Sequence, residues 1–301
     1  MTNQRRFDLV LQSVRDDRRP IKRRPCSFGE TRHVGHPPRA ELAALYAAII
    51  AGMYFAQTWL LFPAFFARAT RVHLPESTQR LKVRTPDGES LVGLRIPGMG
   101  VKTDGAPSLL GFGGNAWNAR TMVLILHRLF PDRSVIGFHY RGYRPSSGRP
   151  NAEGLLSDSL VVFDHLRQAQ ATQPIITVGF SIGSGAAAYV ARHRPVEGLI
   201  LVTPFDSLEA LARDLYWWAP VGPLFRHRMS TIEFVRDSLV PTALLTAEHD
   251  AVVPRRRSEP LREATRNLVF ERVIDSGHNN IYDRPAFAVA MHEALARIEA
   301  V

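Results

Sequence analysis

The chain has 301 residues and a formal net charge of +10, and 45% of its residues are hydrophobic. This length is ample for one α/β domain with a single core, and no internal repeat or low-complexity run is present, which excludes repeat architectures. The single cysteine, Cys26, excludes an intramolecular disulfide.

The N-terminal quarter differs from the rest of the chain. Residues 1–40 contain ten Lys or Arg against four Asp or Glu, and residues 42–67 contain no charged residue. At about 1.5 Å per residue, a helix over that apolar run reaches about 39 Å, against roughly 30 Å for a hydrocarbon core. We therefore expect a basic, disordered tail over residues 1–40 and a transmembrane or membrane-associated helix over residues 41–67.

The charge asymmetry also predicts an orientation. A basic flank marks the cytoplasmic side, so we expect a cytoplasmic N-terminus and a folded domain on the opposite side. The tail suits anionic lipid better than nucleic acid, because it lacks interleaved aromatic residues. Trp59, Phe62, Phe65 and Phe66 are expected to form an interfacial aromatic belt, and Pro63 to end the helix.

Three alternatives to a retained anchor stay open. Residues 67–69, Ala-Arg-Ala, resemble the cleavage site of a signal peptide, although the apolar run is long for one. The arginine pairs of the tail suggest a twin-arginine signal, but the apolar segment starts too far downstream. The helix could also pack on the folded domain.

Ala44, Ala48 and Gly52 form a small-residue face that would suit helix pairing.

From residue 81 onwards, apolar β-branched runs alternate with helical stretches. This order predicts a mostly parallel sheet with helices on both faces, within a domain over residues 68–301. Residues 81–85 and 91–96 read as strands joined by Pro-Asp-Gly-Glu, which is a hairpin signal and predicts an antiparallel start to the sheet.

The run at 174–185, PIITVGFSIGSG, contains a G-x-S-x-G pattern between a predicted strand and a predicted helix. In that context the serine lies on a sharp turn with its hydroxyl exposed. Gly179 and Gly183 leave room where a Cβ would collide with neighbouring backbone. The helix N-terminus favours a developing negative charge. We therefore expect Ser181 to be a nucleophile.

Serine needs a base, and the base needs an orienting acid. His278 follows the last predicted strand, 268–274, and Asp250 follows the strand at 242–246. The order Ser181, Asp250, His278 is that of α/β-hydrolases rather than of the common serine proteases. Glu248 is the alternative acid, and Asp275 is expected to be a turn residue.

The loop after the predicted strand at 107–111 is the candidate oxyanion loop. In a G-x-S-x-G hydrolase one donor is the N–H after the nucleophile, here Ile182, and we assign the other to Asn115. The same loop satisfies a relaxed dinucleotide fingerprint, but the next strand lacks a terminal acid, and Asp132 lies at its wrong end. We expect no cofactor.

Residues 137–150 and 154–158 carry a longer pattern, GFHYRGYRPSSGRP and GLLSD. It resembles the D-Y-R-G-Y-G-x-S-x-G-x-P…G-L…D segment of α/β-hydrolases of the serine-aminopeptidase-like, often membrane-anchored group that includes protein-depalmitoylating hydrolases. The resemblance covers residues 81–296 and implies the α/β-hydrolase fold, with an eight-stranded sheet. It implies the same site residues: Ser181, Asp250 and His278 as the triad, and Asn115 and Ile182 as oxyanion donors.

The chain departs from this family at three positions. Gly113 replaces the histidine of the family's H-G-N, His139 replaces the aspartate before Y-R-G, and Arg144 replaces the glycine after G-Y. These changes affect the expected shape of the oxyanion loop and of the pocket rim.

The family often inserts substrate-covering helices after the sixth strand. Residues 206–240 therefore read either as a small cap or as an ordinary crossover. Trp217 and Trp218 within them would suit an apolar acyl or aryl pocket.

No metal site is expected. His33 and His36 lie in the tail, and His193 and Glu197 are separated by Pro195, which ends a helix.

The sequence thus predicts a membrane-anchored serine hydrolase that cleaves an ester or thioester, with apolar acyl substrates favoured because of the anchor. Its expected partners are a lipid or small-molecule ester, or an acylated protein. The alternatives are a serine peptidase of the aminopeptidase-like kind and a hydrolase-fold binding protein without turnover.

Overall fold

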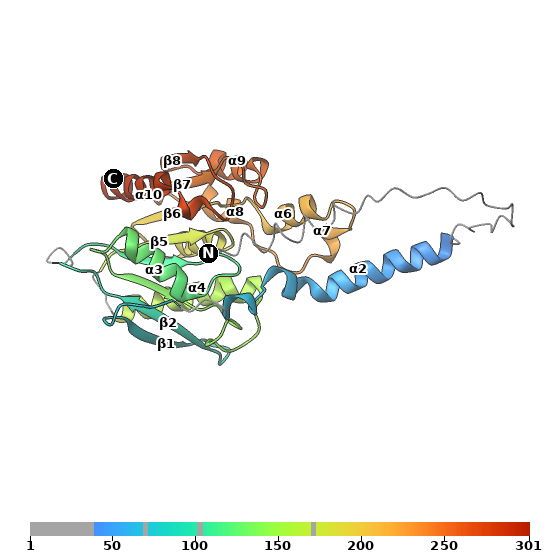
Figure 1. Cartoon of the computed structure of the whole chain (residues 1–301), viewed down its shortest axis with the longest axis horizontal. Coiled ribbons are helices and arrows are strands. Elements are labelled where there is room, and N and C mark those ends of the chain that lie inside the picture. The colour runs from blue at the N-terminus through green and yellow to red at the C-terminus, as the bar shows by residue number, and fades with distance from the viewer. Residues whose placement is uncertain (1–38, 69–71, 101–104, 170–172) are drawn as a thin grey trace, which may run out of the picture. The chain divides into compact units, whose positions relative to one another are not determined.

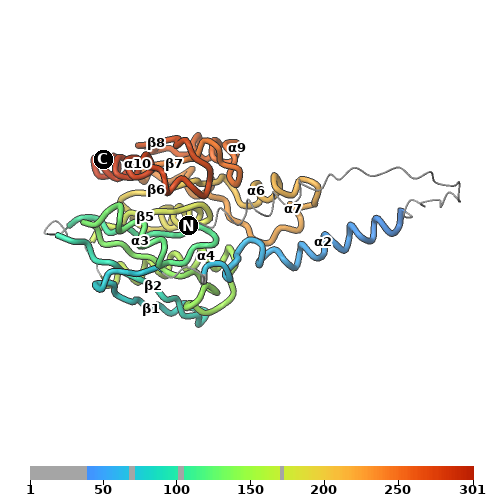
Figure 2. Tube along the Cα trace, viewed as in Figure 1, coloured from blue at the N-terminus to red at the C-terminus, as the bar shows by residue number. Residues whose placement is uncertain are grey.

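The computed structural model describes residues 39–68, 72–100, 105–169 and 173–301. Within them lies an eight-stranded sheet of order β1-β2-β4-β3-β5-β6-β7-β8, with β1 and β8 at its two edges (Figures 1 and 2). The strands are β1 Gln79–Arg84, β2 Ser90–Ile96, β3 Ser108–Phe112, β4 Val135–Phe138, β5 Ile175–Phe180, β6 Gly198–Val202, β7 Thr242–Ala247 and β8 Leu268–Ile274. Pairing is antiparallel from β1 to β2 and from β2 to β4, and parallel elsewhere. The predicted α/β-hydrolase sheet with an antiparallel start is confirmed.

Helices cover both faces of the sheet because its strands are apolar on both sides. In β6, Leu199 and Leu201 belong to one core cluster and Ile200 and Val202 to the other, as the two-residue period of a strand requires. Helices α4, α5, α8 and α9 supply the first cluster, and α3 and α10 the second. The helices are α2 Arg39–Leu61, α3 Ala119–Leu129, α4 Ala152–Ala169, α5 Gly183–His193, α6 Leu208–Leu215, α7 Val221–Leu224, α8 Thr231–Arg236, α9 Arg255–Ala264 and α10 Pro285–Glu299.

Two glycines on neighbouring strands, Gly111 in β3 and Gly137 in β4, have a packing role. A Cβ added to Gly111 would lie 2.1 Å from Met122 Sδ, and one added to Gly137 would lie 2.1 Å from Met122 Cε. The two glycines therefore let α3 lie close on β3 and β4, and this gives Gly111, the first glycine of the dinucleotide-like pattern, a packing role.

Helix α2 is long enough and apolar enough to cross a membrane, with a mean hydropathy of 1.4 over its best window. It ends at Leu61, six residues before the expected boundary, because the chain turns at Pro63. Phe62 is only 3% exposed and packs in the hydrolase core, whereas Trp59 is 67% exposed. Phe62 is therefore a core residue and not part of an aromatic belt. The basic tail, apart from its last two residues, lies outside the described residues.

The loop after β4 contains the charged residues of the longer motif, and they form a structural ion pair. Arg141 Nε and Nη2 donate to the two carboxylate oxygens of Asp158 at 2.7 and 2.5 Å, and Arg141 Nη1 donates to Asp87 at 2.8 Å. His139 is buried at the end of β4, and burial lowers its pKa to about 4, with a smaller contribution from Arg120 and Arg80. This imidazole is therefore neutral at pH 7.

Candidate active site

The G-x-S-x-G segment forms a tight turn between β5 and α5. Ser181 has a φ of +50°, in the left-handed region that few non-glycine residues adopt. A Cβ on Gly183 would lie 2.1 Å from the Phe112 carbonyl oxygen, and one on Gly179 would lie 2.6 Å from the Gly183 carbonyl oxygen. Both glycines are thus required by close backbone approach, as the sequence predicted.

The structure brings Ser181, His278 and Asp250 into one hydrogen-bonded series, although they follow three different strands. His278 Nε2 lies 3.1 Å from Ser181 Oγ, and His278 Nδ1 lies 2.7 Å from Asp250 Oδ2. The other carboxylate oxygen of Asp250 accepts hydrogen bonds from the backbone N–H groups of Val252 and Val253, at 2.9 and 2.6 Å. The carboxylate is therefore fixed in position and is directed at the imidazole.

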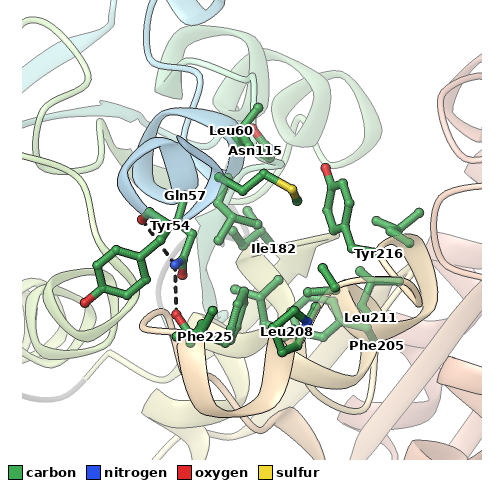
Figure 3. A pocket seen from close by; sticks show the side chains of 18 of the residues that line it. Tyr54, Gln57, Leu60, Asn115, Ile182, Phe205, Leu208, Leu211, Tyr216 and Phe225 are labelled. Atoms are coloured by element: carbon green, nitrogen blue, oxygen red, sulfur yellow. Dashed lines mark hydrogen bonds between the residues drawn. The ribbon is translucent and has the colours of Figure 1, made fainter. Parts of the chain in front are cut away.

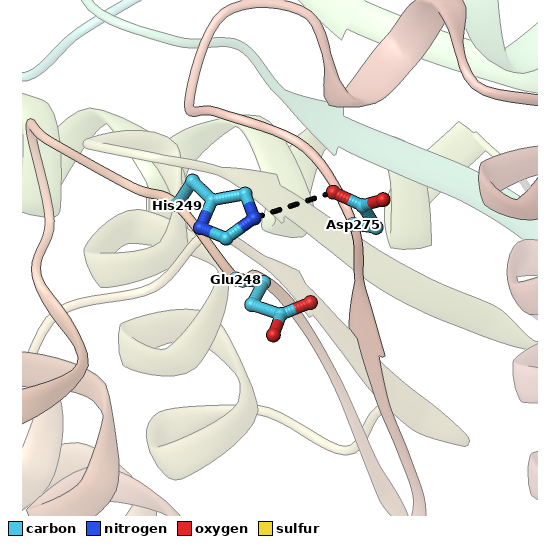
Figure 4. A group of neighbouring side chains, drawn as sticks. All are labelled: Glu248, His249 and Asp275. Carbon is cyan, nitrogen blue, oxygen red and sulfur yellow. Dashed lines mark ion pairs between the residues drawn. The ribbon is translucent and has the colours of Figure 1, made fainter.

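The two alternative acids occupy a different place. Glu248 and Asp275 are exposed and form a surface cluster with His249, whose Nε2 lies 3.4 Å from Asp275 Oδ1 (Figure 4). Each of the three residues offers one atom that could bind a metal, and these three atoms lie within 4.8 Å of one another. Such groups can bind metals, but exposed acidic side chains often approach one another without one, and we assign no metal here.

Asn115 and Ile182 line the same cavity as Ser181, as expected of oxyanion donors. The backbone of the oxyanion loop is held by two tyrosines of the longer motif. Tyr140 Oη donates to the Gly113 carbonyl at 2.6 Å, and Tyr143 Oη donates to the Asn115 carbonyl at 2.7 Å.

Burial raises the pKa of both tyrosines well above the usual value, so both hydroxyls remain donors at neutral pH. The contacts of these two tyrosines with the oxyanion loop were not predicted from the sequence. The place of the tyrosines directly after the strand β4 was the signal that could have indicated such contacts, because the carboxyl ends of neighbouring parallel strands lie together.

Ser181 lines an apolar cavity of about 230 Å³. Figure 3 shows this cavity and labels Ile182, the residue after Ser181. Part of its wall comes from α6, α7 and Phe225, within the segment that the sequence analysis read as a cap or a crossover. The opposite wall comes from α2, which the sequence analysis treated as an anchor. Its residues in the lining are Ile50, Met53, Tyr54, Gln57, Leu60 and Leu61.

Comparison with known proteins agrees with the fold. No protein-family model matches the chain. An uncharacterized protein of Mycobacterium tuberculosis is 32% identical over 209 residues, covering 66% of this chain and 71% of the relative. The lysophosphatidylserine lipase ABHD12 of Xenopus tropicalis is 30% identical over 198 residues, covering 55% of this chain and 50% of the lipase.

Solved structures show the same fold at low sequence identity. The esterase Pf2001 of Pyrococcus furiosus superposes with a TM-score of 0.61 at 16% identity, covering 76% of this chain and 97% of the esterase. A membrane phospholipase A, described as a bacterial virulence factor, superposes with a TM-score of 0.59 at 16% identity, covering 87% of this chain and 99% of the phospholipase. The chain belongs to the α/β-hydrolase superfamily. It is a hydrolase of the ester-cleaving class.

Proposed function

We propose that the chain hydrolyses carboxylic esters or thioesters of apolar acyl groups through Ser181, His278 and Asp250. The observation that carries this proposal is the hydrogen-bonded series of these three side chains, whose serine lines an apolar cavity. A nucleophile, its base and an orienting acid within hydrogen-bond reach are the arrangement that acyl transfer requires.

In the proposed reaction, Ser181 Oγ attacks the acyl carbonyl carbon while His278 Nε2 takes the hydroxyl proton. Asp250 accepts the hydrogen bond from Nδ1–H and offsets the positive charge of the imidazolium. The negative charge on the carbonyl oxygen is stabilised by the backbone N–H of Ile182 and by Asn115. His278 then protonates the leaving alcohol or thiol. Water, deprotonated by His278, attacks the acyl-enzyme, and the acid and free Ser181 are released.

A lipid ester is the favoured substrate class. The cavity is apolar, and two of the matched proteins are named as a lysophosphatidylserine lipase and a phospholipase A. We further propose that α2 is a retained, single-pass anchor with a cytoplasmic N-terminus, because the basic residues precede it and the hydrolase domain follows it. Acylated proteins remain candidate substrates of the same chemistry.

The test is labelling by a fluorophosphonate probe, together with turnover of p-nitrophenyl esters, in wild type and Ser181→Ala. Labelling and turnover that vanish in the folded variant would support the proposal. Folded wild-type protein that neither labels nor turns over esters would contradict it and favour a hydrolase-fold binding protein. Labelling with turnover of peptide amides but not of esters would favour a peptidase.

A further inference from the structure

The second half of α2 presents two different faces. Ile50, Met53, Tyr54 and Gln57 fall at the three- and four-residue spacing of one helical face, and this face lines the cavity over Ser181. On the opposite face of the same turns, Phe55 is 77% exposed and Trp59 is exposed as well. One face of the helix thus lines the cavity that Ser181 also lines, and the other is free to contact lipid.

The facing wall has the same spacing. Leu208, Leu211, Ala212 and Leu215 of α6 recur at three- and four-residue intervals and line the cavity from the other side, as Figure 3 shows for Leu208 and Leu211. Two apolar helical faces therefore border an apolar groove that Ser181 also lines.

Polar contacts fasten α2 to the segment after α7. Gln57 Nε2 donates to the Leu224 carbonyl at 2.8 Å, and Gln57 Oε1 accepts from the Arg226 N–H at 3.0 Å (Figure 3 draws Gln57). Thr58 Oγ1 lies 2.9 Å from His227 Nε2, and the Arg226 guanidinium lies over the Tyr54 ring at 4.7 Å. An amide in an apolar helix is costly without partners, and here both ends of the Gln57 amide are satisfied.

The groove has the size of an acyl chain. The cavity of about 230 Å³ exceeds an engineered apolar cavity of ~150 Å³ that holds benzene, so it has room for more than six carbon atoms. A medium-length acyl chain fits, and an acetyl group leaves most of the groove empty.

The length of α2 relates the groove to the bilayer. A helix needs about 20 apolar residues to span the hydrocarbon core, and α2 has 23, of which residues 50–61 include the groove wall. A spanning α2 therefore puts its groove-lining residues, Ile50 to Leu61 and about 17 Å of helix, in roughly the half of the hydrocarbon core that borders the interface on the hydrolase side. Trp217, just after α6 and 82% exposed, is of the residue type that prefers this interface.

We infer that the groove between α2 and α6–α7 is the acyl-binding site, and that it takes the acyl chain of a bilayer-resident ester directly from the lipid layer. This inference rests on the proposed function. It makes α2 a specificity element of the enzyme in addition to an anchor.

The test uses the full-length protein in lipid nanodiscs. Met53→Trp fills the groove from α2, and Leu211→Trp fills it from α6, so that one variant remains informative if the other does not fold. Phe55→Trp is the matched control on the lipid-facing side of α2. The measured quantity is the ratio of octanoyl to acetyl ester turnover, beside labelling by a small fluorophosphonate.

We expect each groove variant to lower this ratio about tenfold or more while it still labels, because several methylenes lose their contacts. Phe55→Trp is expected to leave the ratio unchanged. Labelled groove variants with the wild-type ratio would overturn this inference alone. Wild-type protein that fails to label would overturn the proposed function and this inference with it.

Discussion

Asp250 makes more contacts than the orientation of an imidazole requires. Its carboxylate accepts two backbone N–H groups in addition to the His278 N–H. An amide at this position would present a donor to Nδ1 and favour the wrong tautomer. We predict that Asp250→Asn lowers kcat about 10⁴-fold, as in other serine triads.

The matched control for Asp250→Asn is Glu248→Gln, which changes the exposed alternative acid two residues earlier. Steady-state ester turnover is the measurement, and Glu248→Gln is expected to resemble wild type. A large loss in Glu248→Gln with little loss in Asp250→Asn would reverse the assignment of the acid.

Tyr143 acts, in this arrangement, through the oxyanion loop and not on the substrate. Its hydroxyl donates to the carbonyl of Asn115, so removing it leaves the loop less fixed. We predict that Tyr143→Phe lowers kcat about 10- to 100-fold with little change in KM, because a small misplacement of a donor weakens the transition state selectively.

Tyr189→Phe serves as the control for Tyr143→Phe, because Tyr189 lies on α5 with its ring against His193 and Phe234. Separate measurement of kcat and KM shows whether Tyr143 positions the oxyanion loop, which affects kcat alone. A variant that is damaged throughout its fold would also have a lower thermal midpoint. Equal kcat values in wild type and Tyr143→Phe would refute the positioning role.

At the level of elements, the turn from β5 to α5 tolerates no side chain at Gly183. An added methyl group would collide with the Phe112 backbone. We predict that Gly183→Ala lowers the thermal midpoint by about 2–10 °C, from roughly 1–3 kcal/mol of overpacking, and abolishes fluorophosphonate labelling.

Gly52→Ala on α2 is the natural comparison, because a Cβ there meets no atom within 4 Å. This variant is expected to keep or slightly raise its midpoint, because alanine favours a helix more than glycine does, and to keep its labelling. Differential scanning calorimetry or fluorimetry of the two variants checks the prediction, and wild-type behaviour of Gly183→Ala would contradict it.

The elements that local signals specify were predictable from the sequence. The strand, turn and helix around Ser181 follow from an apolar run and two glycines within a dozen residues. The wall that α2 contributes was not predictable, because it depends on contacts such as Gln57 with Leu224, 167 residues apart. The tyrosine contacts with the oxyanion loop, 27 and 28 residues apart, were missed for the same reason.

For the molecule as a whole, His139 links stability to pH. Its pKa is about 4 in the folded state against an ordinary 6.5, because it is buried beside the charges of Arg80 and Arg120. The unfolded chain therefore binds a proton in this range before the folded one does. His139 therefore leaves the free energy of unfolding unchanged above about pH 6.5 and lowers it as the pH falls from 6.5 towards 4.

At about 1.4 kcal/mol per pKa unit, we predict a loss of up to about 3 kcal/mol of unfolding free energy from His139. The measurement is chemical denaturation of wild type and His139→Asn at pH 7, 5.5 and 4.5. The variant is the reference, because all other groups titrate in both proteins and only the His139 contribution differs. A smaller decline in the variant supports the prediction, and identical declines contradict it.

The buried Phe62 has a consequence for how the chain is processed. A signal peptidase acting at residues 67–69 would release Phe62 and Ala67, both packed in the core, together with the groove wall on α2. Losing a buried phenylalanine typically costs about 3–5 kcal/mol, a large share of a domain's stability. We therefore expect the intact mass of the membrane-extracted protein to include α2, and a mature form beginning near residue 70 would contradict this.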